Sequence, residues 1–358
     1  MTNHIERIIA LGIILFCGCL NGRTETSPFQ GSLIEARDLV HVDHQELKRQ
    51  SIHQLVVAIQ RPPTIDQASA LTKLREDECV IWYWVEVARD EALAASHPEW
   101  MASIQGHPEW RRFYPDFPEE KEDQIVKVYP WVPIFYQGAF EAQSAKVKKL
   151  LQAWPEGEGV FLNDLQGAPS ACGCGHPLCR WTTDYGPKLT AEQLGHDAPA
   201  QFVQQMEETF PNMECIPVWA TECEAHDKDG WCAGVGCYKG ACWREWSRQL
   251  EPLALHSKRL GALAIYKELG RDLDHYSQEA EWVSMAIRSF QSEMDRYQRP
   301  SVMANRLIAV LQGWDVSPEE IKAQIEQSKL AGASGYVIAK TPIQSGWVPK
   351  MVPLKSSP

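Results

Sequence analysis

Eight short apolar runs, each bounded by turn residues, constrain the fold of this 358-residue chain more than any other feature. They cover residues 55–59, 80–85, 125–135, 160–162, 215–220, 262–266, 307–311 and 336–339. A continuous apolar run is typical of a strand in a parallel sheet whose two faces are both covered. The runs therefore predict eight buried parallel strands.

Amphipathic helical patterns separate most of these runs. Phe140, Val147 and Leu151 fall on one helical face. Residues 317–320 form a capping box that begins a helix, and Gly332 can end that helix. Alternating strands and helices predict an α/β fold, and eight such units predict a (β/α)8 TIM barrel. An open doubly wound sheet is the alternative, but no G-x-G-x-x-G motif follows the first run.

The N-terminus carries the pattern of an export signal. Arg7 precedes a nine-residue apolar run at 8–16, and Cys17-Gly-Cys19 follows it, which is similar to a bacterial lipobox with Cys19 as the lipidated residue. We therefore expect residues 1–19 to be a lipoprotein-type signal peptide, 20–44 a tether and 45–358 the barrel. This predicts a periplasmic or extracellular protein held to the membrane by a lipid anchor on Cys19.

The charge and the aromatic content narrow the class of partner. A formal net charge of -12 argues against nucleic acid as a partner. The 14 tryptophans suit a large core, and they also suit the stacking walls of a carbohydrate cleft.

Four carboxylates follow predicted strands and can converge on one barrel mouth: Glu86, Asp164, Glu222 and Glu268. Glycoside cleavage needs two such groups, one protonated and one ionised. Crowding of carboxylates raises the pKa of one of them, which keeps it protonated near neutral pH. The alternative is that individual acids pair with nearby basic side chains and only hold loops.

Seven cysteines lie in the two loops after the strands at 160–162 and 215–220, so we expect Cys-rich βα loops: Cys172, Cys174, Cys179, Cys223, Cys232, Cys237 and Cys242. In an exported protein the first interpretation is disulfides, with one thiol left over. The alternative is a metal site, and the C-x-C-x4-C spacing does not choose between zinc and an iron–sulfur cluster. Cys79 and Cys215 begin strands and are interpreted as small apolar residues.

Asn163-Asp164 at a strand end, the C-x-C-x4-C loop behind it and the closing segment 312–338 resemble bacterial glycoside-hydrolase-like barrels. Many retaining members end strand seven with Glu, where this chain has Gln312. The resemblance to the α-amylase-like arrangement would make Asp164 the nucleophile and Glu222 the acid. The chain also resembles secreted planctomycete-type proteins of unassigned activity.

The sequence thus predicts a barrel that acts on or binds a carbohydrate at its carboxyl end. Asp164 and Glu222 are the first catalytic pair to consider, with Glu86 and Glu268 as supporting acids. The residues expected to bind substrate are Trp84, Asn163, Trp219, Lys267, Gln312 and Trp314. Two alternatives stay open: a non-catalytic sugar-binding barrel, and a metal or redox protein centred on the cysteine cluster.

Overall fold

Eight parallel strands close into a barrel in the computed structural model of the chain. The structure describes residues 28–49, 52–101, 114–119, 121–165, 197–220, 250, 252–254, 256–265, 279–297, 306–343 and 348–353. The barrel strands, in spatial order, are β1 Phe29–Glu35, β2 Gln54–Ala58, β3 Val80–Glu86, β5 Gly159–Asn163, β6 Glu214–Ala220, β7 Leu260–Ala264, β8 Leu307–Gln312 and β9 Gly335–Ala339. The predicted (β/α)8 barrel is confirmed.

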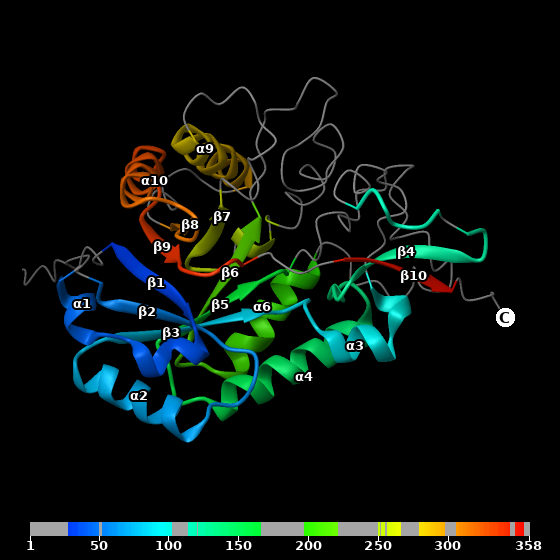
Figure 1. Cartoon of the computed structure of the whole chain (residues 1–358), viewed down its shortest axis with the longest axis horizontal. Helices are drawn as coiled ribbons and strands as arrows, with labels where there is room; N and C mark the ends of the chain where they lie inside the picture. Colours follow the sequence, from blue (N-terminus) through cyan, green and yellow to red (C-terminus); the bar gives the residue numbers. More distant parts are fainter. Residues whose placement is uncertain are drawn as a thin grey trace, which may run out of the picture.

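Helices cover the outside of the barrel (Figure 1). The described ones are η1 Ala36–His41, α1 His44–Arg49, α2 Ile65–Glu76, α3 Glu91–Ser96, η2 Pro98–Trp100, α4 Gln137–Ala153, α6 Ala198–Thr209, α9 Glu279–Tyr297 and α10 Pro318–Leu330. None of the helices within these described ranges is long and apolar enough to cross a membrane.

The sequence-based end points of α10 are confirmed. Ser317 Oγ accepts a hydrogen bond from the backbone N–H of Glu320 at 3.1 Å, and a Glu320 carboxylate oxygen accepts one from the backbone N–H of Ser317 at 2.6 Å. This reciprocal pair satisfies two donors that the first turn of a helix leaves free. Gly332 has φ of +97°, the left-handed conformation that ends helices without a Cβ penalty.

Two of the predicted boundaries were wrong. Phe29–Glu35 lies in the expected tether, yet it forms β1 and closes the barrel by pairing with both β2 and β9. The apolar run at 125–135 supplies β4, Gln124–Tyr129, which stands outside the barrel and pairs antiparallel with β10, Val348–Pro353. Figure 1 shows this two-stranded sheet beside the barrel. The barrel therefore starts sixteen residues earlier than expected, and β1 takes the place in the barrel that the run at 125–135 was expected to fill.

Aromatic rings fill the barrel interior. Phe29 of β1 meets Trp82 of β3 edge-on at 5.2 Å between ring centroids, and it meets Phe161 of β5 at 5.5 Å. Trp84, one turn of the pleat further along β3, stacks on Phe161 at 5.9 Å. Because side chains alternate along a strand, these contacts fix which residues face inward. The interior is thus a packed apolar core, and polar inward residues occur near its two ends.

Candidate functional site

Glu86 and Asn163 end two neighbouring barrel strands. They are register partners in the β3–β5 pair, and they share the inward face of Trp84 and Phe161. Both side chains therefore sit at the carboxyl end of the interior, where barrel enzymes carry their chemistry.

The Glu86 carboxylate is held from two sides. The Trp84 indole Nε1–H donates to one of its oxygens at 2.7 Å, and the Asn163 amide Nδ2–H donates to the other at 2.8 Å. These bonds fix the Asn163 amide so that its oxygen faces away from Glu86. That oxygen is buried and has no hydrogen-bond partner within the described part of the chain.

Asp164 follows directly and completes a carboxyl pair with Glu86. Its side chain is 2% exposed and is hydrogen-bonded to Glu86. Burial raises the pKa of Asp164 well above its ordinary value, and the charge of Glu86 and the hydrogen bond to it raise the pKa further, while Arg89 and Lys146 oppose the change. Of the two carboxyl groups, Asp164 is therefore the one whose surroundings favour the protonated form.

The backbone of Asp164 is strained. Its φ is +62°, a conformation that costs a non-glycine residue about 1–3 kcal/mol and that Asp tolerates better than most. Its second carboxylate oxygen is buried and lacks a partner among the described residues. Strain and an unsatisfied buried oxygen at one residue are a combination found at functional sites rather than in stabilising cores.

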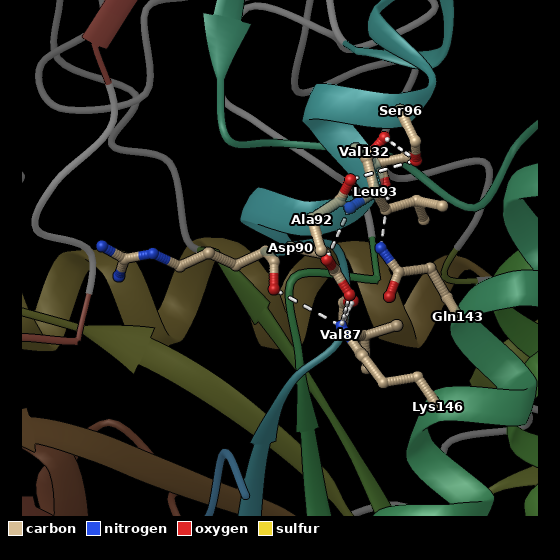
Figure 2. Close-up of polar contacts among 9 residues, drawn as sticks. Val87, Asp90, Ala92, Leu93, Ser96, Val132, Gln143 and Lys146 are labelled. Atoms are coloured by element: carbon tan, nitrogen blue, oxygen red, sulfur yellow. Dashed lines mark hydrogen bonds and ion pairs between the residues drawn. The ribbon is translucent and has the colours of Figure 1, made fainter.

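Two cations, Lys146 and Arg89, act on the carboxyl pair. Lys146, on α4, contacts the Asp90 carboxylate at 3.3 Å and donates to the backbone carbonyl oxygens of Val87 and Arg89 (Figure 2). Burial lowers the pKa of Lys146, and Asp90 is the first of the anions that oppose this. The Arg89 guanidinium lies 5.9 Å above the Trp131 ring.

Neither cation was predicted from the sequence. A signal for Lys146 exists, because it lies on the helical stripe shared by Gln143 and Leu150, which are both buried. A lysine on the buried stripe of a helix usually has a specific partner.

Gln312 is also inward and buried at the carboxyl end, on β8. Its side-chain amide donates to the backbone oxygen of Trp314 at 3.1 Å. The Gln324 side chain of α10 accepts a hydrogen bond from the backbone N–H of Gln312 and donates one to its backbone carbonyl. Gln312 therefore orders the turn that carries Trp314, which is 8% exposed.

Trp219 lies on the other side of the sheet. Phe161 is inward and its register partner is Ile216, so alternation along β6 turns Trp219 outward, towards the helical layer. It is 1% exposed there, so it does not line the carboxyl-end site.

The remaining predicted site residues lie outside the described residues: Glu222, Lys267, Glu268, Cys172, Cys174, Cys179, Cys223, Cys232, Cys237 and Cys242. The choice between disulfides and a metal for these cysteines stays a prediction, as does the signal peptide. Cys215 is a buried free thiol and Cys79 a half-buried one. Within the part of the chain that is described, no cluster of three His, Cys, Asp or Glu could hold a metal ion.

Comparison with family models and with curated proteins finds no match. Solved structures do match. An endo-1,4-β-D-mannanase from Thermotoga petrophila RKU-1 is 10% identical, with 89% of this chain and 90% of that one covered and a TM-score of 0.47. A GH18 chitinase from Pseudoalteromonas aurantia is 9% identical over 87% of this chain and 92% of that one, with a TM-score of 0.42. An HpcH/HpaI aldolase from Desulfitobacterium hafniense DCB-2 is 11% identical over 87% and 86%, with a TM-score of 0.35. At such identities and scores, the barrel assignment rests on the strand pairing rather than on these matches.

Proposed function

We propose that this barrel binds a glycoside at its carboxyl end and hydrolyses it with Asp164 as the general acid. The observation that carries the proposal is the carboxyl pair: a buried Asp164, whose pKa is raised by burial and by the neighbouring Glu86, beside a Glu86 whose two oxygens accept hydrogen bonds from Trp84 and Asn163. A carboxylic acid that stays protonated near neutral pH is what departure of a sugar oxygen requires.

Glu86 has a supporting role in this proposal. A glycosidase holds its two working carboxyl groups about 5 to 10 Å apart, on either side of the scissile bond. Glu86 and Asp164 adjoin each other at the ends of the paired strands β3 and β5 and interact directly, so they do not face each other across a scissile bond. Glu86 therefore serves to keep the proton on Asp164 and to aim it.

The opposing carboxylate then comes from another strand end. Glu222 follows β6 by two residues, β6 pairs with β5, and Glu268 is the alternative. This proposal exchanges the roles that the α-amylase-like resemblance implies, because the pKa of Asp164 is raised and a nucleophile must be ionised. We assign Trp314, Gln312 and Lys267 to sugar binding.

The test uses substrates that differ in their need for acid. Dinitrophenolate is a good leaving group that departs from its glycoside without being protonated. The leaving groups of phenyl glycosides and oligosaccharides need a proton from a general acid. Asp164→Asn should lower kcat on phenyl glycosides by about 10²–10⁴-fold and change it little on the dinitrophenyl substrates. Glu78→Gln is the control, because Glu78 also has a left-handed φ, of +64°, but is exposed and precedes β3 at the far end of the barrel.

Three outcomes separate the alternatives. An equal loss on both leaving groups contradicts the acid role of Asp164. Saturable sugar binding by the wild type, with no turnover on any glycoside of the panel, favours the non-catalytic sugar-binding barrel. Turnover that Cys174→Ser abolishes at intact stability, while Asp164→Asn leaves it unchanged, makes the cysteine cluster the active centre.

We also propose export and lipid anchoring through Cys19. Cys19→Ser should move the protein from the membrane fraction to the soluble fraction, and finding wild-type protein in the cytoplasm with residues 1–18 intact would contradict this. Metal analysis of the purified protein separates zinc or an iron–sulfur cluster from disulfides in the cysteine loops.

A further inference from the structure

The segment Val87–Asp90 connects Glu86 to α3, and its backbone groups are bonded on three sides. The Val87 N–H donates to the Asn163 carbonyl at 3.0 Å, which ties the segment to β5. The Ala88 carbonyl accepts from the Val132 N–H at 2.7 Å, and the Asp90 N–H donates to the Pro130 carbonyl at 3.1 Å. These bonds hold the segment against residues 130–132.

Lys146 holds the third side (Figure 2). Its ammonium reaches from α4 to the Val87 carbonyl at 3.1 Å, the Arg89 carbonyl at 3.4 Å and the Asp90 carboxylate at 3.3 Å. The other Asp90 oxygen accepts from the Leu93 N–H at 2.8 Å and caps α3. One side chain thus fixes the chain that leaves Glu86, using all three ammonium donors.

We propose that Lys146 is a positioning residue: it fixes the segment after Glu86 and so orients the Glu86–Asp164 pair, and its positive charge sets the proton affinity of that pair. The orientation arm rests on the proposed function, whereas the proton-affinity arm does not require that the protein turn over a glycoside.

Charged groups of both signs act on Asp164. Among the described residues these are Glu86 on β3, which raises the pKa of Asp164, and the cations Arg89 and Lys146, which lower it. Asp90 faces Lys146 and partly neutralises it. Removing the Lys146 charge should therefore raise the pKa of Asp164, and removing the Asp90 charge should lower it.

The first experiment follows the proton directly. The infrared carbonyl band of a protonated carboxyl group is absent from a carboxylate, and subtracting the spectrum of Asp164→Asn assigns the band to Asp164. We expect its titration midpoint to move to higher pH in Lys146→Met. Lys149→Met is the matched control, because it removes the same charge from an exposed position on α4 and should leave the midpoint unchanged.

Asp90→Asn supplies the second variant and the opposite sign. Asn caps a helix as well as Asp does, so α3 keeps its cap, while Lys146 loses its counter-ion. The Asp164 midpoint should then move to lower pH. This variant also keeps the test decisive where Lys146→Met fails to fold.

Measurements of turnover test whether Lys146 orients the carboxyl pair. Lys146→Met should lower kcat on phenyl glycosides by about 10- to 100-fold with KM unchanged, because the acid is displaced rather than the sugar. Unshifted midpoints in both Lys146→Met and Asp90→Asn would overturn the inference. Shifted midpoints in a protein without glycoside turnover would support the inference on proton affinity and count against the proposed function alone.

Discussion

The two ends of the barrel interior each carry a glutamate, and their surroundings are opposite. At the amino end, Glu214 begins β6 and accepts two hydrogen bonds from the Arg259 guanidinium, at 2.8 and 2.7 Å. The same guanidinium lies over the rings of Phe29 and Trp82, at 5.4 and 4.9 Å. At the carboxyl end, Glu86 faces a second carboxyl group, on Asp164.

The difference separates stability from chemistry. A bidentate Arg–carboxylate pair satisfies its charges and its geometry, so the amino end stabilises the barrel. A carboxyl pair with a strained backbone and an unsatisfied oxygen costs free energy, and such features persist where they serve a function. The interior carboxylates of this barrel therefore have two different roles, stability at the amino end and chemistry at the carboxyl end.

The largest expected effect comes from Glu86→Gln. The new amide must direct its own donors at either the Trp84 indole N–H or the Asn163 amide, which both donate to Glu86 now. The acid beside it is then misaligned and has lost the anion that raises its pKa. We expect kcat on phenyl glycosides to fall by about 100-fold or more. A kcat equal to that of the wild type would show that the pair is structural.

Glu214→Gln is the matched change at the amino end. It leaves the partly buried Arg259 without its anion, so the free energy of unfolding should fall by about 1–3 kcal/mol. Denaturant unfolding measures the loss, and kcat should stay at the wild-type value. If instead stability is unchanged and kcat falls, the division between the two ends is wrong.

The pH dependence of stability gives the third comparison. The pKa of Asp164 is higher in the folded protein than in the unfolded chain. Its contribution to stability is therefore fully present below the ordinary pKa and is lost as pH rises through the raised, folded pKa, because the unfolded chain releases the proton first. Asp164→Asn should remove this decline. Unfolding free energies of both proteins, measured from acid to neutral pH, should converge at the acid end, and parallel curves would contradict the assignment.

The smallest expected effect distinguishes two tryptophans on β3. Trp84→Phe removes the indole donor to Glu86, whereas Trp82 Nε1 has no hydrogen-bond partner within the described ranges. Both changes remove the same volume, but Trp82→Phe also weakens the contact of the Arg259 guanidinium with that ring, so the difference gives a lower bound for the hydrogen bond. Trp84→Phe should cost about 1–2 kcal/mol more in unfolding free energy than Trp82→Phe. Equal losses would mean that the bond to Glu86 contributes little.

The barrel class, the helices and the α10 cap could be predicted because they depend on local patterns. Continuous apolar runs indicate buried parallel strands, and the 317–320 cap acts over four residues. The candidate acids Glu86 and Asp164 were also predictable, since each stands within two residues of the end of an apolar run. The predictions that failed concern pairing: β1 contains Gly31 and Ser32 and lacks a continuous apolar run, whereas β4 is apolar but pairs with β10, far away in the sequence.

By itself, the sequence determined that a barrel would form and that carboxylates would stand at its strand ends. The reason is that the hydrophobic pattern of each element, and the order of the elements, can be read from short stretches of the chain. Only the tertiary structure decided that Glu86 pairs with Asn163 across β3 and β5, that Asp164 therefore meets Glu86, and that Lys146 of α4 stands behind them. It also decided that Trp219 faces outward. The physical reason is that a one-residue change of register reverses every side chain of a strand, and register is set by the whole closed sheet.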